Sequence, residues 1–297
     1  MPEATELRWE ASDGSALMAC VHGRRDAPSL PVILLHGLSQ QHRFWDPVIA
    51  RLRAPMVAAL DQRGHGASRL DVEADYGIER CAADVLEFMD TVGWDQAVIV
   101  GHSWGASVAL SAATTRRAAG VGLIDGGLWG PSSLGDRPSV RERLRPPALG
   151  IPQEQLWAMI ADSSPFLDAE ARSALSHTFE VDDAGLVRTK IGVERHMRVL
   201  DGLLDYRPDA DLARLACPAW AVVCEPVLPS PQQDAWAQAK ADALARASEV
   251  PGLLIHRWMG AVHDVPLQWP ALVAGFIDAL HGSVAARDPG PMNGRRD

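Results

Sequence analysis

Residues Gln96 to Gly105 read Gln-Ala-Val-Ile-Val-Gly-His-Ser-Trp-Gly, and this stretch decides the fold. A short β-branched apolar run over 97–100 predicts a buried strand, and residues 106–113 predict a buried helix. Between them, residues 101–105 fit the pattern Gly-x-Ser-x-Gly, in which a serine stands on a sharp strand-to-helix turn. Glycines on both sides of Ser103 suit a turn that is too tight for a Cβ atom. The stretch predicts an exposed nucleophile at a helix N-terminus, whose free N–H groups favour an oxyanion.

The composition describes an acidic chain with enough apolar residues for a large core. The chain has 297 residues, 47% of them hydrophobic, and a formal net charge of −10. This charge disfavours nucleic acid and anionic membranes as partners, because both would be repelled by the average field of the protein. Residues 1–7 lack the features of an export signal, and no apolar run approaches the roughly eighteen residues of a membrane span. We therefore expect a cytoplasmic monomer or homodimer that acts on a small molecule.

The sequence contains no motif for a metal or a cofactor. Its four cysteines are Cys20, Cys81, Cys217 and Cys224, and no group of cysteines and histidines has the spacing of a zinc site. Patterns for dinucleotide binding and for a P-loop are also missing from the sequence. We expect four free thiols, as in a reducing compartment, and no metal, dinucleotide or ATP.

Three further segments carry motifs that accompany Gly-x-Ser-x-Gly in a known superfamily. The apolar run 31–35 ends in His36-Gly37-Leu38-Ser39, and residues 61–68 read Asp-Gln-Arg-Gly-His-Gly-Ala-Ser. Late in the chain, His263 follows an apolar strand and precedes a helix predicted over 267–280. With these segments the sequence resembles the α/β-hydrolase superfamily, in particular its cofactor-free, serine esterase-like members with a helical cap.

The resemblance implies a mostly parallel, eight-stranded α/β-hydrolase sheet with helices on both faces and an inserted all-helical cap. The expected division of the chain is a core of residues 1–125 and 216–282, a cap of residues 126–215 and a flexible tail of residues 283–297. Strand signals vanish in the cap region, and helical periodicity covers 153–161, 168–179 and 191–204. The cap is expected to lie over the carboxyl ends of the strands, to cover the serine and to supply most substrate contacts.

The resemblance also implies the roles of the site residues. Ser103 would be the nucleophile and His263 its general base. The backbone N–H groups of Leu38 and Trp104 would form the oxyanion hole. We expect His36 to bond loop backbone. The candidates for lining the substrate pocket are His36, Trp129, Trp157 and Met197.

The sequence leaves open which carboxylate completes a Ser-His-acid triad. In most relatives an aspartate follows the strand that is here 220–223, but the same register places Val227 at that position. Asp125 is one replacement, because haloalkane dehalogenases carry their acid at the end of the corresponding strand. Glu225 is another, if the loop after it is shortened. A serine–histidine dyad without an acid is the third alternative.

These motifs predict a metal-free serine hydrolase that cleaves a carboxylic ester or a lactone through an acyl-enzyme on Ser103, with His263 as the base. A serine nucleophile argues against epoxide hydrolase and dehalogenase chemistry, which needs an ester intermediate on a carboxylate. Two alternatives stay open. One is a cofactor-free lyase or cyclase that uses Ser103 and His263 for proton transfer only, and the other is a non-catalytic small-molecule binder.

Overall fold

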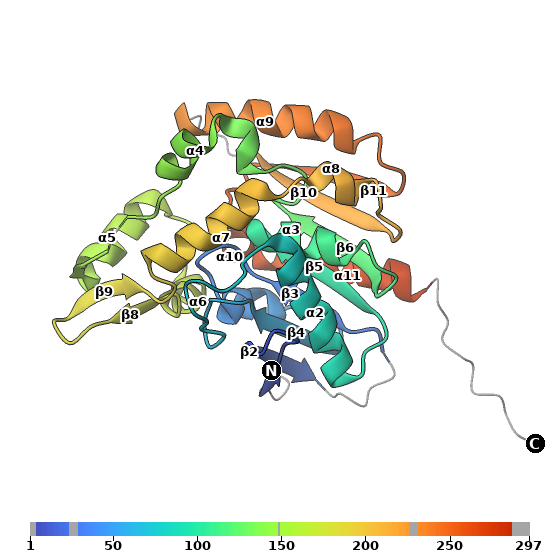
Figure 1. Ribbon diagram of the computed structural model, residues 1–297, viewed down its shortest axis with the longest axis horizontal. Coiled ribbons are helices and arrows are strands. Elements are labelled where there is room, and N and C mark those ends of the chain that lie inside the picture. The colour runs from blue at the N-terminus through green and yellow to red at the C-terminus, as the bar shows by residue number, and fades with distance from the viewer. Residues whose placement is uncertain (1–3, 24–28, 148, 226–230, 287–297) are drawn as a thin grey trace, which may run out of the picture.

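A twisted eight-stranded sheet forms the centre of the computed structural model, which describes residues 4–23, 29–147, 149–225 and 231–286 (Figure 1). The strands in spatial order are β1 (Ala4–Glu10), β2 (Ala16–Gly23), β4 (Met56–Asp61), β3 (Val32–Leu35), β5 (Ala97–His102), β6 (Ala118–Ile124), β10 (Ala219–Glu225) and β11 (Leu253–Met259). Strand β2 pairs antiparallel with β1 and β4, and the other neighbours pair in parallel. The predicted α/β-hydrolase sheet is confirmed.

Residues of the central strands alternate between two hydrophobic layers. Ile33 and Leu35 of β3 belong to one layer, and Val32 and Leu34 belong to the other. Continuous apolar strands of this kind are typical of a parallel sheet that helices cover on both faces. The helices that accompany the sheet are η1 (His42–Trp45), α1 (Asp46–Ile49), α2 (Ile78–Val92), α3 (Trp104–Ala112), α9 (Pro231–Ala247), α10 (Val265–Gln268) and α11 (Pro270–Ala285).

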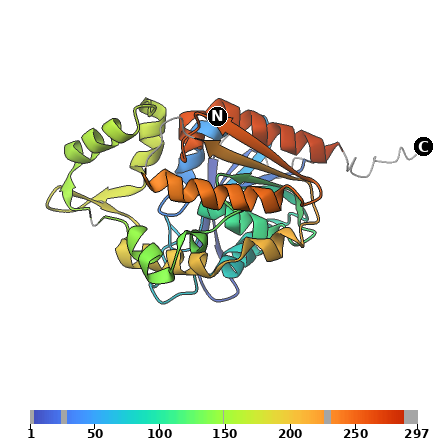
Figure 2. The ribbon, with the colours of Figure 1, turned by 90° about the horizontal axis from the view of Figure 1, so that it is seen from above.

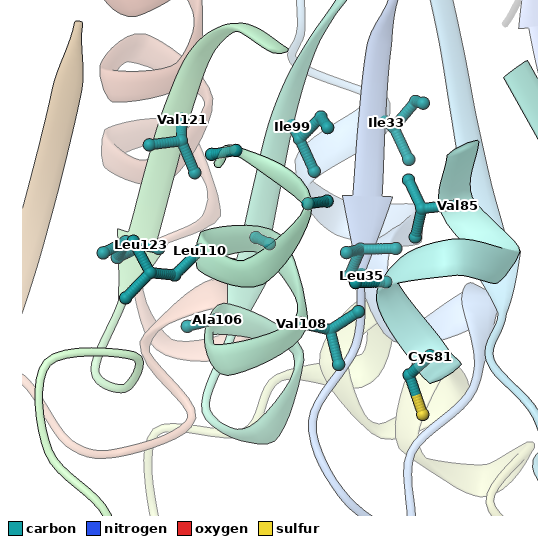
Figure 3. Close-up of a cluster of buried hydrophobic side chains, with 14 of the residues drawn as sticks. Ile33, Leu35, Cys81, Val85, Ile99, Ala106, Val108, Leu110, Val121 and Leu123 are labelled. Atoms are coloured by element: carbon teal, nitrogen blue, oxygen red, sulfur yellow. The ribbon is translucent and has the colours of Figure 1, made fainter. Parts of the chain in front are cut away.

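The first layer joins the sheet to α2 and α3. Figure 3 shows Ile99, Val121 and Leu123 of the sheet together with Val108 of α3 and Val85 of α2. Every residue of α3 is buried, as expected for a helix that is apolar on all sides. The helix that follows Ser103 is therefore held firmly against the sheet, while α1 and α11 pack on the opposite face.

The segment between β6 and β10 is not all-helical, so that part of the prediction is wrong. Its elements are η2 (Pro131–Leu134), α4 (Arg137–Arg143), β7 (Ile151–Pro152), α5 (Gln153–Ser163), α6 (Ala169–Ser176), β8 (Phe179–Val181), β9 (Leu186–Thr189), α7 (Val193–Asp205) and α8 (Pro208–Leu212). Strands β7, β9 and β8 form a small antiparallel sheet. The cause is the turn before β9: Gly185 has a φ of 78°, and the carboxylate of Asp182 accepts hydrogen bonds from the N–H groups of Ala184 and Leu186. This turn chemistry forms a hairpin where helical periodicity predicted the end of a helix.

The small sheet and α5 extend to one side of the large sheet, as Figures 1 and 2 show. Helix α6 connects this extension to the core, because Arg51 of the core forms a bidentate ion pair with Glu170 at 2.9 and 3.0 Å. At the other end of the chain, α11 continues to Ala285, so the predicted tail from residue 283 begins too early. Residues 287–297 of that tail lie outside the described residues.

We find no helix in the described ranges that combines the length and the apolar character needed to cross a bilayer.

Candidate active site

Ser103 stands on a strained turn between β5 and α3. Its φ of 55° and ψ of −119° are rare for a residue that carries a side chain. A Cβ atom on Gly101 would lie 2.0 Å from the carbonyl oxygen of Gly105. A Cβ atom on Gly105 would lie 2.5 Å from the carbonyl oxygens of Leu35 and His36. These are backbone contacts that no side-chain rotation relieves, so both glycines are needed to bring α3 against the end of β3.

Replacing Gly101 by alanine is expected to lower the free energy of unfolding by about 3 kcal/mol, because the added methyl group must displace the backbone of α3. Chemical denaturation of the purified variant measures this change. Gly275→Ala is the matched control: Gly275 lies inside α11, and the new methyl group would meet no atom within 4 Å apart from the backbone of its own helix. This control is expected to raise stability by roughly 0.5–1 kcal/mol. Equal stability of Gly101→Ala and the wild type would contradict the prediction.

Three side chains beyond the ends of strands β5, β6 and β11 form one hydrogen-bonded chain. The Nε2 atom of His263 lies 2.9 Å from Oγ of Ser103, and its Nδ1 atom lies 2.6 Å from Oδ2 of Asp125. Ser103 follows β5, Asp125 follows β6 and His263 lies in the loop after β11. Parallel strands end at the same edge of the sheet, which brings the three loops together. Nδ1–H donates to the carboxylate, and Nε2 is left to accept the proton of the serine.

Asp125, and not Glu225, is the carboxylate next to His263. Asp125 has a left-handed φ of 45°, so the chain turns sharply as it leaves β6. Glu225 pairs instead with Arg257 of the neighbouring strand β11, whose Nε lies 2.5 Å from its Oε1. Of the two carboxylates that the sequence left open, the structure brings only Asp125 into contact with the histidine.

The carboxylate of Asp125 is buried, with 3% of the residue exposed, and is surrounded by donors. Its Oδ1 accepts hydrogen bonds from the N–H of Cys224 at 3.1 Å and from Nζ of Lys240 at 2.7 Å. Burial by itself raises the pKa of Asp125, but the hydrogen bond and charge of His263, together with Lys240, outweigh it and lower the pKa to about 2. Asp125 therefore stays ionised at neutral pH.

The pKa of His263 is shifted in the opposite direction. Desolvation by the surrounding protein acts to lower this pKa, although 56% of the side chain is exposed, but the hydrogen bond to Asp125 and its negative charge outweigh desolvation and raise the pKa above the usual value. Asp264 adds to the increase and Lys240 opposes it. A general base must be neutral, so catalysis that depends on His263 is expected to be lost as the pH falls through this raised pKa.

Leu38 and Trp104, the predicted sources of the oxyanion hole, lie next to Ser103 and line the same cavity. Trp104 is the first residue of α3. The loop that carries Leu38 passes against the serine, because a Cβ atom on Gly37 would lie 3.2 Å from Cβ of Ser103. Both residues line the cavity beside the serine, and the role of their N–H groups as oxyanion donors stays a prediction.

His36 is fully buried and does not line the cavity, so its place among the pocket candidates is wrong. Its Nδ1–H donates to the carbonyl of Gly37 at 2.8 Å, and its Nε2 accepts from the N–H of Gln62 at 3.1 Å. Burial lowers the pKa of His36 to about 4, so the ring is neutral. The prediction that His36 bonds loop backbone is confirmed.

A cavity of about 740 Å³ opens beside Ser103. Trp129 lines it as predicted, but Trp157 and Met197 do not. Trp157 lies on α5 and packs edge-to-face on Phe179 of the small sheet, with ring centroids 6.4 Å apart. Met197 is buried in a hydrophobic cluster of α4 and α7 residues. Both side chains are held by packing within the inserted segment instead of facing the serine.

The core supplies more of the described cavity lining than residues 126–215 do, which corrects the expectation that the cap makes most contacts. Helix α9 alone contributes Ala237, Lys240, Ala241 and Leu244. These residues could not be recognised from the sequence, because helical periodicity does not show which face of a helix meets a cavity. One signal was present: Lys240 is one of two lysines in the chain, the other being Lys190.

The sequence model of the “Alpha/beta hydrolase family” matches residues 32–281, which is most of the chain. The chain belongs to this family. Epoxide hydrolase B of Mycobacterium tuberculosis (strain ATCC 25618 / H37Rv) is 36% identical over 99 residues, which cover 32% of this chain and only 28% of that protein. RutD of Stutzerimonas stutzeri (strain A1501), whose name refers to carbamate hydrolysis, is 25% identical over 209 residues, or 67% of this chain and 74% of RutD.

Two solved structures share the fold over almost the whole chain. E-2-(Acetamidomethylene)succinate hydrolase superposes with a TM-score of 0.75 at 22% identity, covering 94% of this chain and 99% of that one. The thioesterase domain from the curacin biosynthetic pathway superposes with a TM-score of 0.72 at 18% identity, covering 93% and 99%. At these identities the likeness shows the fold alone, whereas the family and the names of the sequence relatives support a hydrolase.

Proposed function

We propose that this alpha/beta hydrolase is a serine hydrolase that cleaves a carboxylic ester or a lactone through an acyl-enzyme on Ser103. The observation that carries the proposal is the hydrogen-bonded chain from Ser103 through His263 to Asp125, with 2.9 and 2.6 Å between the bonded atoms. A neutral imidazole between a hydroxyl and an ionised carboxylate is the arrangement that activates a serine. The cavity beside Ser103 provides room for a small-molecule substrate.

The proposed reaction has two halves. His263 takes the proton of Ser103 while Oγ attacks the carbonyl carbon, and the N–H groups of Leu38 and Trp104 stabilise the oxyanion. Asp125 holds the Nδ1–H of His263 and stabilises the imidazolium that forms. His263 then protonates the leaving alcohol, and in the second half it activates water to release the acid and restore Ser103.

The match to an epoxide hydrolase does not carry epoxide opening to this chain. In that reaction a carboxylate attacks and forms an ester that water can cleave, whereas attack by Ser103 on an epoxide would leave a stable ether. We further propose that residues 126–215 act as a cap, which together with α9 restricts access to the serine.

Intact mass after incubation with a small fluorophosphonate tests the proposal. We expect one adduct on the wild type and none on Ser103→Ala, with circular dichroism confirming that both are folded. Hydrolysis of a p-nitrophenyl ester in ¹⁸O-labelled water is expected to place the label in the acid product. Folded wild type that takes no adduct would overturn the proposal, and turnover of a substrate without incorporation of solvent oxygen would indicate a lyase or a cyclase instead.

A further inference from the structure

The cavity beside Ser103 has a mainly apolar wall. Its apolar residues include Trp129, Leu144, Leu200, Leu203, Ala241 and Leu244. Its volume of about 740 Å³ falls within the range of pockets that enclose small organic molecules. Transfer of an apolar group from water to such a wall is favourable in proportion to the area that is covered.

Each charged side chain among the described cavity residues has a partner of opposite charge. Nζ of Lys240 lies 2.7 Å from Oδ1 of Asp125, and Nε of Arg257 lies 2.5 Å from Oε1 of Glu225. His196 also lines the cavity, but burial lowers its pKa to about 4 and leaves it neutral. Among the described cavity residues, an ionic group of a substrate would therefore find no free counter-charge, and an unpaired buried charge is costly.

We propose that the part of the substrate that fills this cavity is uncharged and apolar, such as an alkyl chain or a hydrophobic ring. This rests on the proposed function, because the cavity selects substrates for turnover only if Ser103 is the nucleophile. The serine and His263 open onto the same cavity as the apolar wall, so a scissile carbonyl at Ser103 places its substituent against that wall.

Two ester series test the proposal. For p-nitrophenyl esters, kcat/KM is expected to rise about fifteenfold from acetate to butyrate, at about fourfold per methylene, and to rise again for hexanoate. The half-ester of adipate has the chain length of hexanoate but ends in a carboxylate, and we expect a kcat/KM at least about a hundredfold lower. Acetate esters of methyl, butyl and hexyl alcohols cover the case in which the alcohol occupies the cavity. A kcat/KM that does not change with chain length in either series, or a kcat/KM for the adipate half-ester equal to that for hexanoate, would overturn the inference.

A bulky residue in the wall supplies a second test. Ala241→Trp fills part of the cavity and is expected to lower kcat/KM for hexanoate at least tenfold more than for acetate. Ala245→Trp is the matched control, because Ala245 is exposed on the same helix and is not among the cavity residues. If fluorophosphonate labels wild-type Ser103 but kcat/KM shows no chain-length preference, this inference alone is contradicted. If fluorophosphonate does not label the wild type, the proposed function is contradicted.

A different observation concerns Lys240, which connects α9 to the proposed acid. Its Nζ donates to Oδ1 of Asp125 at 2.7 Å and to the carbonyl of Cys224 at 3.3 Å, and it lies 4.9 Å from the ring centroid of Trp129. The other carboxylate oxygen of Asp125 accepts from His263. Lys240 therefore restrains the rotation of the carboxylate that orients the imidazole.

The charge of Lys240 also acts on His263. The titratable and charged groups that face this imidazole are Asp125 after β6, Lys240 on α9, His102 at the end of β5 and the adjacent Asp264. His102 is neutral, because burial lowers its pKa to about 4. Without Lys240, the negative charge of Asp125 would stabilise the imidazolium more strongly.

We infer that Lys240 is a positioning residue, which orients Asp125 and sets the pH below which His263 stops acting as a base. Like the first inference, this one rests on the proposed function. In Lys240→Met, the acidic limb of the kcat/KM profile is expected to move to higher pH by about one unit. Lys240→Arg keeps the charge and is expected to keep the limb near its wild-type position.

Lys190→Met removes the other lysine, which lies between β9 and α7, and is the control for a general loss of charge. Its profile is expected to superpose on that of the wild type. A Lys240→Met profile with an unchanged acidic limb would overturn the inference, even if its plateau were lower. Ser103 labelling of each variant shows separately whether the proposed function holds.

Discussion

Turnover of a p-nitrophenyl ester is expected to fall by about a million-fold in Ser103→Ala, because the oxygen that forms the acyl-enzyme is removed. His263 would still lie beside the substrate, but it has no nucleophile to deprotonate. The oxyanion donors and the cavity remain, so residual hydrolysis above the rate in water is expected to persist. Steady-state kcat measured with the colorimetric ester, at enzyme concentrations that exclude wild-type contamination, gives the change.

Ser111→Ala is the matched control for this variant. Ser111 lies on the same helix α3, is buried and is not among the cavity residues. It is expected to retain wild-type kcat, since only its local packing changes. If Ser103→Ala hydrolysed the ester within tenfold of the wild type, Ser103 could not be the nucleophile, and a binder or a proton-transfer enzyme would become the better hypothesis.

Asp125→Asn is expected to lower kcat about ten-thousand-fold with little change of shape. The carboxylate now accepts the Nδ1–H of His263 and leaves Nε2 free for the serine proton. An amide in its place can donate to Nδ1, which stabilises the tautomer that carries its proton on Nε2 and cannot act as a base. It also removes the negative charge that stabilises the imidazolium.

Glu225→Gln is the control for the other carboxylate that the sequence left open. Because Glu225 pairs with Arg257, the kcat of the Glu225→Gln variant is expected to stay within a few-fold of the wild-type value. Thermal unfolding of both variants separates a catalytic effect from a loss of stability. A loss of stability is expected to matter more for Asp125→Asn, because Lys240 loses its negatively charged partner. A large loss in Glu225→Gln with a small loss in Asp125→Asn would reverse the assignment of the acid.

Local patterns predicted the elements that depend on local chemistry. The apolar run 97–100, the glycines around Ser103 and the helix after them appear as β5, a strained turn and α3. The hairpin at 179–189 is also local in origin, because its turn from Asp182 to Gly185 lies between the helices predicted over 168–179 and 191–204, where helical periodicity made no prediction. Turn residues specify backbone geometry directly, so this turn forms a hairpin although the resemblance implied an all-helical cap.

The acid of the site could not be chosen from the sequence, because it depends on two strands that are far apart in the chain. Asp125 follows β6 and Glu225 ends β10, and these strands are neighbours in the sheet. Both carboxylates therefore stand near the same edge. The turn at Asp125 directs one side chain to His263, while Arg257 on the next strand binds the other.

The sequence by itself determined the fold family, the strained serine and the late histidine, since each rests on residues that are adjacent in the chain and share one local conformation. Only the tertiary structure decided which carboxylate meets His263, that Lys240 of α9 binds that carboxylate, and which side chains line the cavity. These contacts join segments separated by more than a hundred residues, and their geometry depends on the order of the strands and on packing between layers. No local pattern contains that information.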